Sequence, residues 1–241
     1  MNYQIADLIV SYEPKHADFA RFLEPFIYQG DREPDLVLTY TPDEIEAMHK
    51  RMVEGTTASE AESFGVANQF NKKIIRYGAM LVHSSALVLD GKAYLFSAAS
   101  GVGKSTHTRL WLREYGDRVH IMNDDKPVVR MNGDGVTAYG TPFDGGSGIA
   151  LNERFPLGAI IFIERGEHNA VRIPPDKEVI QLLYFQTAHM VGAKTAEAML
   201  QNFDSLIRRT SFYVLTCNME PEAARVMYRA LKENERRQFI K

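Results

Sequence analysis

The sequence predicts an α/β (or α+β) protein in which a mixed sheet flanked by helices carries a phosphate-binding loop, with a small N-terminal appendage. Three observations predict this fold. The apolar residues Tyr94 to Phe96 lead into a loop of small residues, Gly103-Lys104-Ser105 follows, and residues 107–115 then suit a helix. A strand, a glycine-containing loop and a helix in this order form the context in which a Walker A motif binds phosphate.

The loop is expected to hold the phosphates of a nucleotide. Gly101 and Gly103 let successive backbone N–H groups point at one phosphate chain, and the helix that follows adds its positive end. Lys104 brings a positive charge to the outer phosphates, and the Ser105 hydroxyl is a ligand for Mg²⁺. The expected nucleotide-binding residues are Ala98, Ala99, Ser100, Gly101, Val102, Gly103, Lys104, Ser105 and Thr106.

One position departs from the motif. Its first glycine is Ala98 in this chain. Alanine can hold the turn if the loop does not demand a positive φ at that residue. A plain Gly/Ser turn between a strand and a helix is the alternative interpretation, but several residue types agree at fixed offsets, which favours phosphate binding.

Composition excludes several classes of function. The net charge of −3 over 241 residues, with no basic block, does not indicate a nucleic-acid partner. The longest apolar run, near residues 157–163, is too short to span a membrane, and the N-terminus lacks the pattern of a signal peptide. The single cysteine, Cys217, excludes an internal disulfide and is expected to be buried in a strand. A cytoplasmic, enzyme-sized domain fits these observations.

The N-terminal third is expected to form a small subdomain. Short apolar runs between Pro, Gly and acidic turns predict strands at 5–10, 22–28 and 36–40. A capping box at Thr41–Glu44 begins a helix that Gly55 ends, and Ser59-x-x-Glu62 begins a second helix. We interpret residues 1–78 as an α+β subdomain and residues 79–241 as the nucleotide-binding domain.

The remainder alternates strands and helices. Residues 80–89 predict one strand, a tight turn follows at Asp90-Gly91, and residues 92–97 form the strand that feeds the loop. Further strands are expected at 119–122, 127–130, 136–139, 157–163 and 211–217. Further helices are expected at 176–188, at 196–207 and after Pro221. The glycine-rich residues 140–148 suit a mobile loop beside a ligand.

Three polar residues outside the loop are candidates for chemistry. His83 precedes Ala98 by fifteen residues, on the neighbouring strand. Asp124 and Asp125 end a strand about twenty residues after the loop, where proteins of this kind place the carboxylate that holds Mg²⁺. Taken singly, His83 also fits a hydrogen-bonded histidine at a strand start, and the two acids also fit a solvated turn.

Together these segments resemble a known superfamily. Residues 82–86, 100–106 and 123–125 are similar to the core of the phosphoenolpyruvate carboxykinase superfamily, which includes HPr serine kinase/phosphorylase and shorter kinase-like proteins. The resemblance covers roughly residues 80–165 and implies that ATP and Mg²⁺ are used. Because relatives of that kind are oligomeric, self-association is an expectation as well.

The resemblance also implies roles for single residues. His83 would lie by the reacting phosphate, and Lys104 would clamp the phosphates. Asp124 and Asp125 would supply a Mg²⁺ contact and the acid/base, with no order fixed between them, and Ser105 would be the loop's Mg²⁺ ligand. The candidate catalytic residues are therefore His83, Lys104, Asp124 and Asp125, and the candidate metal ligands are Ser105, Asp124 and Asp125.

The expected activity is transfer of the γ-phosphate of ATP to a hydroxyl of a protein, a peptide or a small molecule. Arg165 and Asp144 are candidate substrate contacts. Thr106 stands where the HPr kinases usually carry Glu, and their Glu-Leu-Arg-Gly signature is not matched, which argues against HPr as the acceptor. Two alternatives remain open: dephosphorylation by attack of phosphate, and a nucleotide-binding module without catalysis.

Overall fold

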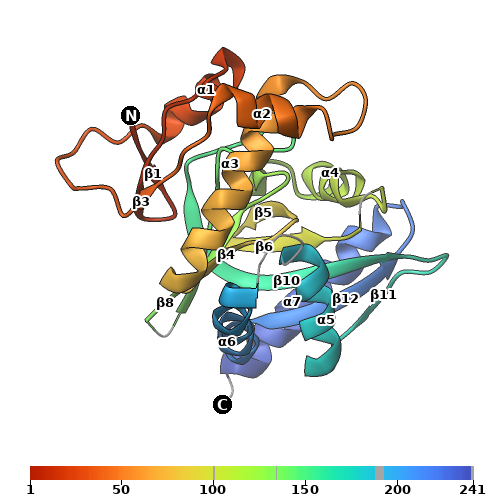
Figure 1. Ribbon diagram of the computed structural model, residues 1–241. Helices are drawn as coiled ribbons and strands as arrows, with labels where there is room; N and C mark the ends of the chain where they lie inside the picture. Colours follow the sequence, from red (N-terminus) through yellow and green to blue (C-terminus); the bar gives the residue numbers. More distant parts are fainter. Residues whose placement is uncertain (100, 134, 188–192, 240–241) are drawn as a thin grey trace.

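A computed structural model describes residues 1–99, 101–133, 135–187 and 193–239 of the chain. A mixed sheet forms the centre, helices cover both of its faces, and the N-terminal residues lie at the top of the view in Figure 1. The predicted α/β class is therefore confirmed. In the described part of the chain every helix is too short or too polar to cross a membrane.

The central sheet has nine strands. They are β4 (Ala79–Leu81), β5 (Ser85–Leu89), β6 (Lys92–Ser97), β7 (Val119–Asn123), β8 (Val128–Asn132), β9 (Gly135–Tyr139), β10 (Arg154–Arg165), β11 (Ala170–Arg172) and β12 (Ser211–Cys217). The order runs β4-β8-β9-β10-β6-β5-β7, and β12 pairs with both β10 and β11. The first residues of β10 pair antiparallel with β9, and the rest of β10 pairs parallel with β6 and β12. The long strand β10 thus joins the two halves of the sheet.

Strand direction brings the candidate site residues to one edge. β6 and β10 are parallel, and β5 is antiparallel to both β6 and β7, so β6, β7 and β10 all end at the same edge. The phosphate loop follows β6, and the Asp124-Asp125 pair follows β7. His83 lies at this edge as well, because it is two residues before the start of β5.

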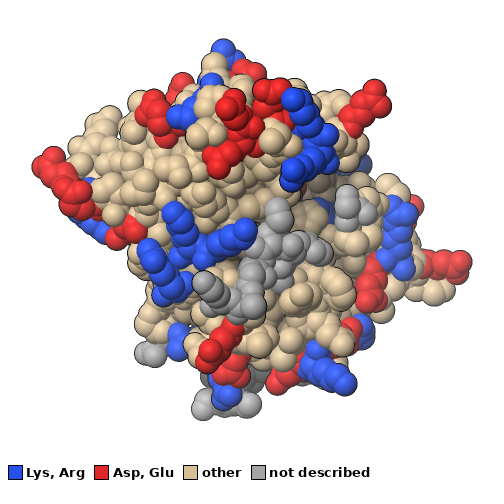
Figure 2. All heavy atoms as spheres, viewed as in Figure 1, with Lys and Arg blue, Asp and Glu red and all other residues tan. Residues whose placement is uncertain are grey.

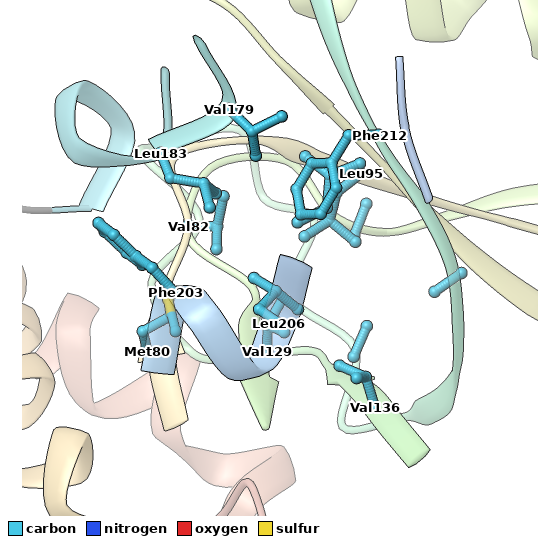
Figure 3. Close-up of a cluster of buried hydrophobic side chains, with 14 of the residues drawn as sticks. Met80, Val82, Leu95, Val129, Val136, Val179, Leu183, Phe203, Leu206 and Phe212 are labelled. Carbon is cyan, nitrogen blue, oxygen red and sulfur yellow. The ribbon is translucent and has the colours of Figure 1, made fainter. Parts of the chain in front are cut away.

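Helices bury the two faces of the sheet. One face is covered by α4 (Lys104–Tyr115) and α7 (Glu222–Phe239), through residues that include Trp111 and Met227. The other face is covered by α5 (Asp176–Thr187) and α6 (Ala193–Arg209). Figure 3 shows Leu183, Phe203 and Leu206 of these helices pointing towards strand residues such as Val129. Burial of apolar area on both faces stabilises the strand ends that hold the site.

The N-terminal elements pack onto the same sheet. They are β1 (Asn2–Ile5), β2 (Leu8–Ser11), α1 (Ala17–Leu23), β3 (Leu36–Val37), α2 (Pro42–His49) and α3 (Ala58–Ile74), with the 3₁₀ turns η1 (Glu24–Phe26) and η2 (Ile75–Tyr77); η3 (Gly116–Arg118) follows α4. Phe70 of α3 lies 5.7 Å, between ring centroids, from Phe143 of the glycine-rich loop. A subdomain boundary near residue 78 stays a prediction.

The strand predicted at residues 22–28 is wrong. This segment ends α1 and forms η1. Phe19 and Leu23 are buried and lie four residues apart, so one face of a helix turns towards the core. The apolar run that suggested a strand is the C-terminal part of this helical pattern.

The single strand predicted at residues 80–89 is also wrong, since it divides into β4 and β5. The backbone N–H of His83 donates to the Gln186 carbonyl, and that of Ser84 donates to the Asp125 carbonyl. These bonds leave the sheet ladder, so His83 lies in a break between two strands rather than on a strand.

Two helix boundaries differ from prediction, although the capping box of Thr41 and Glu44 is confirmed. α2 ends at His49, before Gly55. α3 begins after Thr57, whose capping box uses Glu60 in place of the predicted Ser59 and Glu62. Cys217 is buried in β12, as predicted.

Candidate active site

The phosphate loop has the backbone conformation that its sequence suggests. Gly101 has φ +77° and Gly103 has φ +120°, values that L side chains rarely adopt. Among the described non-glycine residues, positive φ occurs at three positions outside the loop, so Ala98 keeps an ordinary conformation. α4 begins at Lys104, and the first N–H groups of a helix have no partner within it. Ser100, predicted to bind the nucleotide, lies outside the described residues.

His83 lies between a cation and a carboxylate. Its Nε2 atom is 3.1 Å from Lys104 Nζ and 3.4 Å from Asp125 Oδ1. Its Nδ1 atom is 3.0 Å from Gln186 Oε1, which can only accept, so we assign the ring proton to Nδ1. Nε2 of that tautomer accepts a hydrogen bond from Lys104. A donated bond from Nε2 to Asp125 requires a second proton on the ring.

Burial and charge keep the two bases of this cluster less protonated than usual. Burial lowers the pKa of His83, and the neighbouring Lys104 charge lowers it further. Burial also lowers the pKa of Lys104, against the opposing effect of Asp125 and Asp124. The neutral form of His83 is therefore favoured at neutral pH, which agrees with its role as hydrogen-bond acceptor for Lys104.

Ser105 and Asp124 form the second contact between the loop and the acidic turn. The Ser105 hydroxyl donates to Asp124 Oδ2 over 3.2 Å. The other carboxylate oxygen, Asp124 Oδ1, is buried and has no hydrogen-bond partner in the described part of the chain. A buried oxygen without a partner is costly, so this atom is suited to bind a cation or a donor that the protein itself does not supply.

The turn after β7 is fixed by side chains that position both acids. Asn123 Oδ1 accepts hydrogen bonds from the backbone N–H groups of Asp125 and Lys126, at 3.1 and 2.8 Å. Asn123 Nδ2 donates to the carbonyl of Thr141, and the Thr141 hydroxyl donates to the carbonyl of Lys126. The Lys126 ammonium forms an ion pair with the Asp125 carboxylate. The orientation of the acids is therefore set by neighbours within the same edge of the sheet.

The two candidate substrate contacts lie beside the site but bind the protein's own backbone. Arg165 donates to the carbonyls of Val102 and Gly101, at 3.0 and 2.5 Å, and so holds the outer side of the phosphate loop. Asp144 is buried, and its carboxylate accepts from the backbone N–H groups of Gly146 and Gly148. In this structure both side chains shape loops at the edge of the site.

Three further residues contribute to the cluster, although the sequence alone assigns none of them a role. Gln186 approaches His83 from α5, which is 103 residues away in the chain. Lys126 forms an ion pair with Asp125 and directly follows the acids in the sequence. The sequence shows that Lys126 is near the acids, but not that its side chain points towards Asp125. Asn123, next to the acids, orients the turn as described above. Long-range packing decides the position of Gln186, whereas Asn123 and Lys126 act on residues next to them in the sequence.

A cavity of about 420 Å³ extends from the phosphate loop along the ends of β10 and β12. Its lining includes Leu110, Ile163 and Met219 as apolar residues and Asn218 as a polar one. The volume suits a small organic ligand. The cavity adjoins Gly103 of the loop.

The oxygen atoms of Asp124 and Ser105 are better suited to Mg²⁺ than to a metal ion that many protein groups must bind. Within the described residues no cluster of three or more His, Cys, Asp or Glu side chains could hold a metal. Mg²⁺ usually keeps several waters and binds one or two protein oxygens together with substrate phosphates. The unpaired Asp124 Oδ1 and the nearby Ser105 hydroxyl match this requirement.

Comparison with known proteins gives distant structural likenesses. The chain matches no protein-family model, and no curated protein matches its sequence. A similar solved structure is the HPr(Ser) kinase/phosphatase of Coxiella burnetii, with a TM-score of 0.38 and 11% sequence identity, over 67% of this chain and 99% of that chain. So distant a likeness says nothing of the activity of this chain.

Proposed function

We propose that this chain is a Mg²⁺-dependent phosphotransferase that moves the γ-phosphoryl group of ATP to a hydroxyl group. The observation that carries the proposal is the meeting of three separate chain segments at one edge of the sheet. There Lys104 and Ser105 of the loop contact His83 and Asp124, and His83 contacts Asp125. Phosphoryl transfer needs a loop that binds the phosphates next to carboxylates that can bind Mg²⁺ and orient the acceptor hydroxyl. Asp124 and Asp125, which have different neighbours, could supply these two carboxylates.

The nucleotide would bind along the loop and the adjacent cavity. The N-terminal N–H groups of α4 and the Lys104 ammonium would bind the phosphates. The cavity lined by Leu110, Ile163 and Met219 would hold the nucleoside. Arg165 supports this geometry by fixing two loop carbonyls, and its hydrogen bonds keep those carbonyls turned away from the phosphate side.

The residues present fit one Mg²⁺ ion, held by Asp124 and Ser105 together with phosphate oxygens. When bound there, it would neutralise charge that develops on the phosphate oxygens. Ser105 and Asp124 are already joined by a hydrogen bond, so little rearrangement is needed for both to face the same ligand.

Asp125 is the residue we assign to the acceptor hydroxyl. Its carboxylate is only 15% exposed and is flanked by Lys126 and His83. The acceptor oxygen forms a bond to Pγ while the bond between Pγ and the bridging oxygen breaks, and the electron pair leaves with ADP. The proton of the hydroxyl passes to Asp125. In a loose transition state this proton moves late, so orientation of the hydroxyl by Asp125 contributes most.

Two substitutions test this assignment. Lys104→Ala should weaken ATP binding by about tenfold or more, because it removes a charge-assisted contact to phosphate. Asp125→Asn should lower the turnover by about 10²-fold or more while the ATP dissociation constant changes little. ATP binding is measured by calorimetric titration, and turnover by release of ADP. Unchanged turnover in Asp125→Asn would refute the role of Asp125, and ATP binding without any turnover in the wild type would favour a binding module without catalysis.

A further inference from the structure

A second cavity lies beside the acidic turn of the proposed site, with Lys126 in its lining. Its volume is about 460 Å³, within the range of small-molecule sites. It is enclosed by α1, α3, residues 52–56 and the glycine-rich loop at 143–146. We call it the α1–α3 pocket. None of the residues predicted from the loop motif lines it, and most of its wall comes from the N-terminal elements.

The α1–α3 pocket reaches the acid that we assign to the acceptor. Lys126, which pairs with Asp125, is part of its wall. Gly145 is part of the wall as well, and a Cβ atom added there would lie 2.8 Å from Asp125 Cγ. Two residues of the pocket wall, Lys126 and Gly145, therefore lie directly against Asp125.

The inner wall of the pocket is apolar. Phe19 and Phe143 are fully buried, and their rings stack with centroids 6.4 Å apart. Phe22 and Phe64 add two more aromatic side chains to the lining, and Ser63 supplies a hydroxyl. Such a wall binds a ring or a branched alkyl group, whose removal from water is favourable.

The charge around the pocket is negative. Its lining holds Glu54, Glu60 and Asp144 against the single cation Lys126, which is already paired with Asp125. Residues 1–78 as a whole carry thirteen Asp and Glu residues and eight Lys and Arg residues. Figure 2 shows acidic side chains over the N-terminal helices at the top of this face, with some basic side chains among them. An anion is repelled from such a pocket, and a cation is attracted to it.

From these observations we infer that the phosphate acceptor is a small alcohol with one apolar ring or alkyl group and no negative charge, and that a cationic amino alcohol is favoured. This inference rests on the proposed phosphotransfer. The apolar group lies against Phe22 and Phe64, and the amino group faces Glu54 and Glu60. The hydroxyl lies near Lys126 and Asp125, where its proton leaves as the new O–P bond forms and ADP departs.

A series of three small probes of different charge tests the inference. The probes are phenylalaninol (cationic), N-acetylphenylalaninol (neutral) and 3-phenyllactate (anionic), which share one ring and one hydroxyl. Binding is measured by calorimetric titration of the full chain without nucleotide, so the result does not depend on catalysis. Phenylalaninol should bind at least about tenfold more tightly than 3-phenyllactate, and the neutral probe should lie between them. Equal affinity for all three would overturn the inference.

Two variants with matched controls locate the binding. Ser63→Leu fills the pocket and should weaken phenylalaninol binding by about tenfold or more, whereas Ser205→Leu, on α6, should not change it. Glu54→Lys, at an exposed position where misfolding is not expected, should reduce the preference for the cationic probe about threefold or more, and Glu197→Lys should leave it unchanged. Unaltered probe binding in both pocket variants would overturn the assignment.

Titration of the same proteins with ATP and Mg²⁺ separates this inference from the proposed function. If ATP binds to the wild type but the probes do not discriminate, the acceptor class is wrong and phosphotransfer stands. If the probes discriminate but ATP does not bind, the proposed function fails, and the pocket's role as an acceptor site fails with it. Transfer of ³²P from γ-labelled ATP to phenylalaninol, lost in Asp125→Asn, is the positive result.

Discussion

Asp124→Asn should separate the stability of the protein from its ability to bind Mg²⁺ and nucleotide. The amide keeps the shape of the side chain and an oxygen to accept the Ser105 hydrogen bond, and it removes a negative charge whose Oδ1 atom has no partner. Loss of attraction to Lys104 opposes this relief, so the ligand-free free energy of unfolding should change by no more than about 1 kcal/mol. In a chain of this size that corresponds to a midpoint shift of about 2–4 °C.

The ligand-dependent part of the stability should disappear in the same variant. A ligand at one hundred times its dissociation constant stabilises the folded state by about 2.7 kcal/mol, or roughly 5–10 °C in the unfolding midpoint. Thermal unfolding is recorded with EDTA and then with Mg²⁺ and a non-hydrolysable ATP analogue. The exposed Asp117→Asn provides the matched control and should keep the full shift. A large loss of ligand-free stability in Asp124→Asn, or a retained Mg²⁺-dependent shift, would refute the reasoning.

Three further predictions follow from other parts of the structure. Gly145→Ala should lower the turnover about tenfold or more with ATP binding retained, because the new Cβ atom displaces the Asp125 carboxylate. Gly148→Ala is the control, since Gly148 has a similar positive φ and a Cβ atom added there meets no atom within 4 Å. Equal losses of turnover in the two variants would contradict the contact between residue 145 and Asp125. Burial lowers the pKa of His107 to about 4, so the folded state binds a proton at this residue less readily than the unfolded chain does. The free energy of unfolding should therefore fall by up to about 3 kcal/mol as the pH drops from about 6.5 to 4. Urea unfolding at several pH values should show a shallower fall in His107→Gln, and an identical slope would be evidence against this histidine. Glu62→Ala should cost about 3 kcal/mol in urea unfolding, because the buried carboxylate accepts four hydrogen bonds from residues 12–16, and a loss below about 1 kcal/mol would refute that role.

The fold class and the edge of the sheet that carries the site could be predicted because local signals and strand order agree. The loop at Gly101–Ser105 combines positive-φ glycines with a strand before it and a helix after it, and each part has its own sequence signature. The acids follow the next parallel strand, so their place at the same edge depends on topology rather than on side-chain detail. That part of the prediction needed no tertiary contacts.

The direction and partners of the site residues could not be predicted, because distant segments set them. His83 is turned towards Lys104 by a break in the strand that depends on hydrogen bonds to Gln186 and Asp125. Neither bond has a signature in the local sequence, where the apolar run looks continuous. The helix α1 was missed for a similar reason, since the burial of Phe19 against Phe143 is visible only in the folded chain.

The α1–α3 pocket shows what a motif-centred interpretation leaves out. The N-terminal residues carry no phosphate-binding signature, and their sequence alone predicts only a small appendage. In the structure their aromatic residues Phe19 and Phe22 line a cavity that also contacts Lys126. A surface assembled from α1, α3 and a loop far along the chain has no period or spacing that the sequence could reveal.

The most direct test of the central claim is a crystal structure with Mg²⁺ and a non-hydrolysable ATP analogue. We expect the triphosphate in the loop that ends at Lys104, with the metal bound by Ser105 and Asp124 and with Asp125 facing the γ-phosphate from the side of the α1–α3 pocket. A triphosphate bound elsewhere, or a metal that contacts neither Ser105 nor Asp124, would contradict it.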